Sequence, residues 1–115
     1  MAVYIDADDG IRRVGNNKKV YVMVLKKFNG AALLEDLKNK LASGDCAASQ
    51  AQAHTIKGLA ANLSLQDLRE KAADLELALK NAGTTDGADI SVISAISEST
   101  AATDEAVKIW ISENS

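Results

Sequence analysis

One stretch decides the fold of this chain: Ala53-His54-Thr55-Ile56-Lys57-Gly58-Leu59-Ala60-Ala61-Asn62-Leu63. Its apolar residues recur at i, i+3, i+4 and i+7, which is the spacing of one face of an α-helix. At roughly 100° per residue, Ile56, Leu59 and Leu63 form the side that we expect to be buried. His54, the only histidine in the chain, lies about 160° from Ile56 and should face solvent.

Two residues with almost no side chain accompany the histidine on its exposed face. Gly58 lies roughly 40° and Ala61 roughly 20° from His54 around the helix. A glycine inside a helix costs about 1 kcal/mol relative to alanine, and an exposed glycine has no packing gain to offset that cost. Bare backbone beside the imidazole instead lets another macromolecule approach the ring, which is a nucleophile near neutral pH. Lys57 would supply positive charge beside an anionic group attached there.

Several other kinds of chemistry lack the residues that they need. On the histidine face, no Ser, Cys or acidic residue completes a triad, so hydrolysis is not indicated. The sequence has no Gly-x-x-x-x-Gly-Lys-Ser/Thr loop for a nucleotide. Cys46 and His54 are too few ligands for zinc, so we expect no metal site. The single cysteine allows no internal disulfide, which fits a reducing cytoplasm. The net charge of −3 argues against nucleic acid as the main partner.

The composition predicts one all-α domain. The chain has 115 residues, no proline, and many residues that favour helices, namely alanine, leucine, lysine and glutamate. One Trp, two Tyr and one Phe leave the core to aliphatic side chains. No basic segment followed by an apolar run marks a signal peptide, and no stretch approaches the roughly 18 uncharged apolar residues of a membrane span.

Apolar spacing and capping residues predict a set of helices at 8–14, 18–43, 46–63, 65–82 and 89–112. The four long ones are expected to form an up-down-up-down antiparallel four-helix bundle over residues 17–115. Residues 1–16 form a leader with the short extra N-terminal helix. The whole of 1–115 is then a single domain.

Three places in these helices leave alternatives open. Asn29-Gly30 in the middle of the second helix either kinks or breaks it. Ser64 ends the histidine helix and is a candidate cap for the next one, with Asp67 in the capping-box position. Ser99-Thr100 is a candidate interruption of the last helix. Trp110 is expected to anchor the core or the end of the bundle.

A wider set of residues carries a resemblance to a known family. The set is His54-x-x-Lys57-Gly58, Ala61-Asn62-Leu63, Leu68 and Leu75-Glu76, preceded by Ile5-Asp6, Gly10-Ile11-Arg12-Arg13-Val14-Gly15-Asn16, Tyr21, Leu25, Phe28 and Ser43-Gly44-Asp45. It resembles the histidine-containing phosphotransfer (HPt) domain, and in particular the HPt domains at the C-terminal end of bacterial hybrid sensor kinases. Ser64 departs from the pattern, since the family often has glycine there.

The resemblance implies a phosphocarrier in a two-component phosphorelay. His54 would accept a phosphoryl group from the aspartyl phosphate of one receiver domain and pass it to the aspartate of another. The family generally uses the Nε2 nitrogen of the ring, and the sequence does not show which nitrogen acts. Lys57 would offset phosphoryl charge, Gly58 would admit the partner's backbone, and Ala61 would leave space for an apolar contact. Such a domain has no kinase site of its own.

The predicted partner surface consists of Gln50, Ala51, Gly58, Ala61 and Asn62. Gln50 lies one turn before His54, where it either hydrogen-bonds the ring or phosphoryl oxygens or stays a solvated polar residue. We expect Mg²⁺ in the receiver domain, because no carboxylate cluster near His54 could hold it. Relay partners must separate, so we expect weak binding to receivers by a monomer. Its place is then the cytoplasm, or the cytoplasmic end of a membrane-bound hybrid kinase.

Three other interpretations compete with this one. A structural or oligomerising bundle, with His54 incidental, would need a second exposed apolar stripe, and none is strong. A receiver-binding adaptor without phosphotransfer is less favoured, because both His54 and Lys57 are present. The third is an enzyme with its own active site. A single histidine, with no constellation of carboxylates, does not make an active site.

Overall fold

The computed structural model describes residues 2–115, which fold into six α-helices and one short 3-10 helix, with no strand. In chain order they are α1 (Ala7–Arg13), α2 (Lys18–Lys26), α3 (Gly30–Ala42), α4 (Cys46–Asn62), α5 (Gln66–Ala82), η1 (Thr85–Gly87) and α6 (Ile90–Asn114). The predicted all-α class is therefore confirmed. Met1, the first residue of the predicted leader 1–16, lies outside the described residues.

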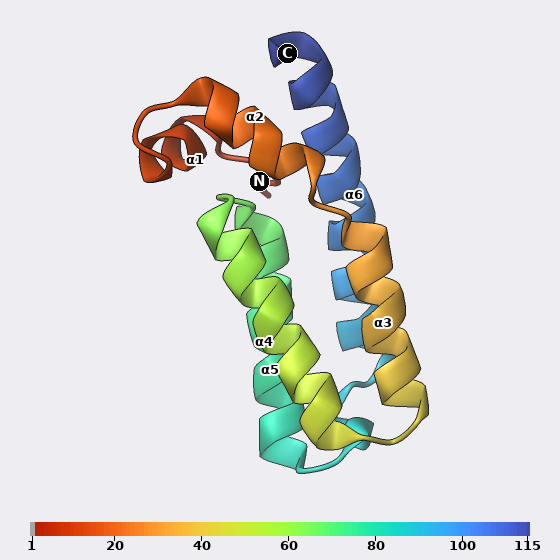
Figure 1. The fold of residues 1–115 in the computed structure, drawn as a ribbon. Coiled ribbons are helices and arrows are strands. Elements are labelled where there is room, and N and C mark those ends of the chain that lie inside the picture. Colours follow the sequence, from red (N-terminus) through yellow and green to blue (C-terminus); the bar gives the residue numbers. More distant parts are fainter. Residues whose placement is uncertain (1) are drawn as a thin grey trace.

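Four long helices form the body of the molecule (Figure 1). α3 packs against α4, α4 against α5, α5 against α6, and α6 against α3, so these helices form a closed ring. At one end, α2 packs against α6 and α1 packs against α2. Because each helix of the ring packs mainly against two others, each keeps one face toward solvent.

Side-chain caps explain where most of the helices begin. Side-chain oxygens accept hydrogen bonds from the backbone N–H groups three residues later at Asp6, Asn17, Asn29, Asp45 and Asp89. Each bond satisfies an N–H group that has no partner within its helix, and such a cap contributes about 1 kcal/mol. After α5, Gly83 adopts a left-handed conformation with a φ of 71°, which glycine takes without a steric penalty.

The predicted single helix over 18–43 is wrong, because the chain breaks between α2 and α3. Asn29 leaves the helical conformation and caps α3 with its side chain. The next two N–H groups, those of Gly30 and Ala31, donate to the carboxylate of Asp104 on α6 at 3.0 and 2.9 Å. Of the two alternatives at Asn29-Gly30, a kink or a break, the structure shows the break. Asp104, 74 positions after Gly30, stabilises it.

The core is aliphatic, as the composition predicts, with one fully buried tyrosine. Its most deeply buried large residues, each at most 2% exposed, include Leu25, Leu37, Ile56, Leu65, Leu68, Leu75, Leu79 and Ile96. The hydroxyl of Tyr21 donates to the carbonyl of Leu63 at 2.6 Å. The ring of Tyr21 meets that of Trp110 edge to face, with 5.3 Å between the centroids. Trp110 thereby links α6 to α2 and packs against the core.

The spacing predicts Leu59 in the buried stripe of α4, but its side chain is exposed. Its exposed fraction is 38%, whereas Ala53, Ile56 and Ala60 are each at most 2% exposed. These three residues centre the buried face of α4, and Leu59 falls beyond its edge. The prediction that Leu59 is buried is therefore wrong.

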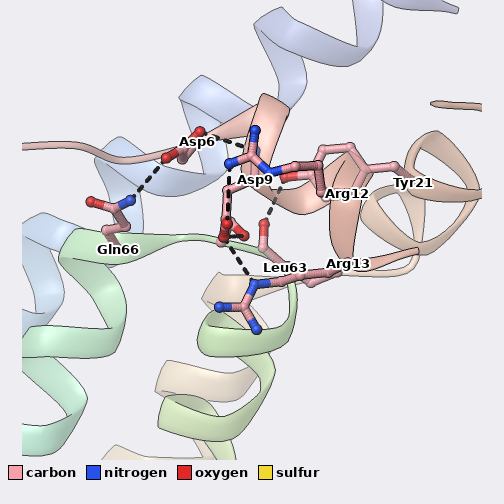
Figure 2. Close-up of polar contacts among 8 residues, drawn as sticks. Asp6, Asp9, Arg12, Arg13, Tyr21, Leu63 and Gln66 are labelled. Carbon is pink, nitrogen blue, oxygen red and sulfur yellow. Dashed lines mark hydrogen bonds and ion pairs between the residues drawn. The ribbon is translucent and has the colours of Figure 1, made fainter. Parts of the chain in front are cut away.

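The leader holds the turn between α4 and α5 (Figure 2). Asp9 accepts a hydrogen bond from the Ser64 hydroxyl at 2.6 Å, and Asp6 accepts one from the Gln66 amide at 3.0 Å. Ser64 is therefore not the predicted cap of α5. Its φ is 58°, its hydroxyl is bound to Asp9, and the capping position falls to Leu65, which makes no side-chain cap bond.

The last helix, α6, runs without a break through Ser99-Thr100, so the interruption considered there is absent. Both residues are buried in the bundle. In the described part of the chain, not even this helix of 25 residues is long and apolar enough to cross a membrane.

Candidate functional site

The exposed face of α4 carries His54 near the middle of the helix. The His54 side chain is 66% exposed, whereas Ala53, Ile56 and Ala60 on the buried side are at most 2% exposed. The cap at Asp45 starts the helix, and the small residues of its first half let it pack closely against its neighbours. The imidazole therefore points to solvent, as the periodicity predicts.

Small residues leave the approach to the imidazole open. A Cβ built at Gly58 would meet nothing within 4 Å, so no packing contact explains the glycine. Ala51 is exposed and Ala61 is half-buried on the same side of α4. A partner surface can therefore come within contact distance of the backbone at Gly58 and reach the ring.

A carboxylate from the neighbouring helix α5 binds both of the candidate catalytic side chains. Oε2 of Glu76 lies 2.9 Å from Nδ1 of His54, and Oε1 of Glu76 lies 2.5 Å from Nζ of Lys57. The Glu76 side chain is only 14% exposed and that of Lys57 is 33% exposed. Water therefore competes little for the carboxylate, and the three side chains form one connected group.

The electrostatics of this group fix its hydrogen-bond roles. The hydrogen bond from Lys57 is the main cause that lowers the pKa of Glu76, and the hydrogen bond from His54 adds to it against the opposing effect of burial. Glu76 is therefore ionised at neutral pH and can only accept hydrogen bonds. Nδ1 of His54 must then carry a proton and donate it, which leaves the lone pair of a neutral ring on Nε2.

Glu76 is the site residue that the sequence reasoning did not place. It belongs to the Leu75-Glu76 element of the family resemblance, but a helical wheel of α4 alone cannot show a residue of α5. The expectation that no acidic residue lies on the histidine face holds for α4 itself, and the carboxylate that reaches His54 comes from α5. Among residues 2–115, no group of three or more His, Cys, Asp or Glu side chains is placed to hold a metal ion.

An open hollow of about 750 Å³ lies beside His54, between α4 and the end of α5. Gln50, Ala51 and Glu76 are among the residues that line it. The amide of Gln50 donates to Sγ of Cys46 at 3.3 Å, so it does not bind the histidine ring. A hydrogen bond from Gln50 to the ring, one of the alternatives considered, is therefore not made, and Gln50 lines the same hollow as His54.

Asn62 lies apart from this hollow, at the last residue of α4. It is exposed and lines a different groove, formed with apolar residues that include Val24 of α2, Phe28 between α2 and α3, and Leu33 of α3. The structure thus brings together His54, Lys57, Gln50 and Ala51 with Glu76, continues the same face through Gly58 and Ala61, and sets Asn62 at its margin.

Comparisons with known proteins agree with this geometry. The model of the Hpt domain family matches residues 29–106, more than half of the chain. Among solved structures, the chain is similar to the HPT domain of an Hpt sensor hybrid histidine kinase from Shewanella, with a TM-score of 0.82 and 16% identity. That match covers 96% of this chain and 95% of the other, and at this identity it establishes the fold alone. A search of curated protein sequences found no match.

Proposed function

Because the chain belongs to the Hpt domain family, it is a phosphocarrier of a phosphorelay, and we propose that His54 carries the phosphoryl group. Hpt domains are phosphotransfer modules without kinase activity, and they interact with receiver domains. One observation carries the assignment of the residue. The chain has a single histidine, its side chain is 66% exposed, and the carboxylate of Glu76 binds its Nδ1, which leaves Nε2 as the ring nitrogen with the lone pair.

In the proposed reaction, the lone pair on Nε2 attacks the phosphorus of an aspartyl phosphate on a receiver domain. The N–P bond forms as the bond between phosphorus and the aspartate oxygen breaks, and the aspartate leaves as a carboxylate. The proton on Nδ1 stays on the ring, where the negative charge of Glu76 stabilises the positive charge that develops. The reverse steps deliver the phosphoryl group from Nε2 to the aspartate of a second receiver.

Lys57 and Glu76 act on this reaction through different effects. Glu76 orients the ring and selects the tautomer, so we assign it a positioning role. Lys57 lies about one turn along α4 from His54, and its positive charge offsets the charge of the transferred phosphoryl group. Its hydrogen bond to Glu76 holds the flexible lysine side chain in that position.

The receiver is proposed to cover Gln50, Ala51, Gly58, Ala61 and Asn62. Gly58 admits the partner's backbone, because no side chain occupies the space above it. We propose that the receiver also supplies the Mg²⁺ that neutralises charge in phosphoryl transfer. Among residues 2–115, Glu76 is the carboxylate that contacts His54, and it is already bound to both His54 and Lys57.

We further propose how this unit is organised. The ring of α3 to α6 is assigned as an up-down-up-down antiparallel bundle. The described part of the leader, residues 2–16, and helix α2 are assigned to its end, and we propose a single domain over 1–115. It is proposed to act as a monomer in the cytoplasm, alone or as the cytoplasmic end of a hybrid kinase.

Transfer from a phosphorylated receiver domain to this protein, with His54→Gln as the matched variant, tests the proposal. The wild type should take up phosphate into an acid-labile, base-stable product, and the variant should fold normally and take up none. Equal uptake by the variant would rule out His54 as the carrier. Receiver binding without any transfer to the wild type would favour an adaptor.

A further inference from the structure

A pocket of about 290 Å³ lies near the C-terminal end of α4, where the leader and α5 meet it. Arg13 of α1 and Arg69 of α5 line the pocket, together with Asp9. Ala61 of α4 and Gln66 of α5 also line it. Two elements, α1 and α5, therefore bring charged side chains to one small polar depression beside α4.

This pocket lies on the same face of the α4–α5 pair as the histidine. Ala61 follows His54 by seven residues and Arg69 precedes Glu76 by seven, so each lies about 20° away around its helix and roughly 10 Å along it. The two helices run in opposite directions, because His54 contacts Glu76 while Ala61 and Arg69 line one pocket. A partner that covers His54 and Gly58 would therefore extend naturally to the pocket.

Positive charge is left over in this pocket. Asp9 accepts hydrogen bonds from Nε of Arg13 at 2.9 Å, from Arg12 at 3.4 Å and from the Ser64 hydroxyl at 2.6 Å, so its carboxylate already has three donors (Figure 2). Within residues 2–115, neither the two terminal nitrogens of Arg13 nor the guanidinium of Arg69 takes part in an ion pair. Both groups remain available for another anionic group.

The pocket joins residues from inside and outside the segment that the family model matches. His54, Lys57 and Glu76 lie inside the segment 29–106 that the family model matches, whereas Arg13 lies before it. The transfer chemistry thus resides in the segment that the family model matches, and Arg69 lies in that segment as well. The leader adds a charged contact from outside that segment.

We propose that Arg13 and Arg69 together bind an acidic side chain of the receiver domain that docks over His54, and that this contact selects among receivers. The inference rests on the proposed function, since it requires docking over the histidine. Guanidinium groups match a carboxylate, because they bind it through two parallel charge-assisted hydrogen bonds. Charges at the rim of an interface act mainly on encounter rate and on partner choice.

The test compares Arg69→Glu and the double variant Arg13→Glu/Arg69→Glu with Lys108→Glu. Lys108 is an exposed residue on α6, a helix whose packing neighbours are α2, α3 and α5, so its variant matches the charge change at a different place. The rate of transfer is measured from a panel of phosphorylated receiver domains at low and at physiological salt. Phosphoramidate, which phosphorylates an imidazole directly and releases ammonia, reports the reactivity of His54 without docking.

Arg69→Glu should lower kcat/KM for the fastest receiver about tenfold at low salt, mainly through KM, and less at higher salt. The double variant should lose more of this kcat/KM. Arg69→Glu should keep the wild-type phosphoramidate rate and Tm. Lys108→Glu should match the wild type in all rates. The inference would be overturned if Arg69→Glu left receiver transfer unchanged, or if Lys108→Glu lowered it equally. It would also be overturned if Arg69→Glu lowered the phosphoramidate rate as much as the receiver transfer. If neither phosphoramidate nor any receiver phosphorylates the wild type, the proposed function itself fails.

Discussion

The Nδ1 atom of His54 lies 2.9 Å from Oε2 of Glu76 on the neighbouring helix. The same carboxylate binds Lys57, so a single residue of α5 orients both candidate catalytic side chains of α4. The orientation of the imidazole therefore depends on how α4 and α5 pack, and it is set before any partner arrives. Preorganised charge of this kind lowers a barrier because no reorganisation is needed during the reaction.

Replacement of Glu76 by glutamine should slow phosphorylation of His54. The amide has nearly the same shape, but it has no negative charge and no longer fixes the proton on Nδ1. We expect the rate with phosphoramidate to fall about tenfold, which corresponds to about 1.4 kcal/mol in the activation free energy. Glu70→Gln, on an exposed position of the same helix, serves as the control and should react like the wild type. A wild-type rate for Glu76→Gln would show that the carboxylate does not position the ring.

Substitutions at Gly58 should separate stability from function. A Cβ fits there without contact, so Gly58→Ala should raise the free energy of unfolding by up to about 1 kcal/mol. Gly58→Gln should slow transfer from a receiver domain, because its side chain occupies the space that the partner's backbone needs, while the phosphoramidate rate stays unchanged. Urea unfolding and the two transfer assays measure these effects. Receiver transfer at the wild-type rate would contradict the role given to Gly58.

The buried hydroxyl of Tyr21 should contribute to stability and not to transfer. It donates to the Leu63 carbonyl at 2.6 Å, and burial raises its pKa to about 12, so it stays protonated at neutral pH. Tyr21→Phe leaves that carbonyl without this partner and should lower the free energy of unfolding by about 1–2 kcal/mol. Chemical denaturation measures the loss, and the phosphoramidate rate should not change. A variant as stable as the wild type would show that the carbonyl finds another partner.

Acid should weaken the contact between the leader and the α4–α5 turn. The hydrogen bond from Ser64, followed by that from Arg13, lowers the pKa of Asp9 from 3.8 to about 2. Since the folded state then binds its proton less readily than the unfolded state, the contribution of Asp9 is present above about pH 4 and is lost as the pH falls toward 2. The difference in unfolding free energy between the wild type and Asp9→Asn should shrink over this range. Asp8→Asn, at the exposed neighbouring residue, serves as the matched control.

Features encoded within one helix could be predicted from the sequence. The histidine helix was expected at 46–63 and is observed at Cys46–Asn62, and the next was expected at 65–82 and is observed at Gln66–Ala82. Asp45 and Gly83 mark these ends chemically, through a side-chain cap and a left-handed turn. The exposure of His54 followed in the same way, because the angle between residues of one helix depends only on their spacing.

Features that depend on distant contacts could not be predicted in this way. The break before α3 is stabilised by Asp104, and Ser64 is bound to Asp9 instead of capping α5. Glu76 reaches His54 only because α5 packs beside α4 in this register. Each of these contacts joins segments that are far apart in sequence, so local spacing and propensity carry no sign of them.

The position of the phosphoryl group on the protein tests the central claim most directly. The chain has one histidine, so protein labelled with ¹⁵N-histidine gives the signals of a single imidazole. After reaction with phosphoramidate, NMR coupling between phosphorus and nitrogen identifies the ring atom that is modified. Phosphorus coupled to Nε2 of His54, and absent from His54→Gln, is the predicted result. Phosphorus on Nδ1, or phosphate still bound to the His54→Gln protein, would contradict the account.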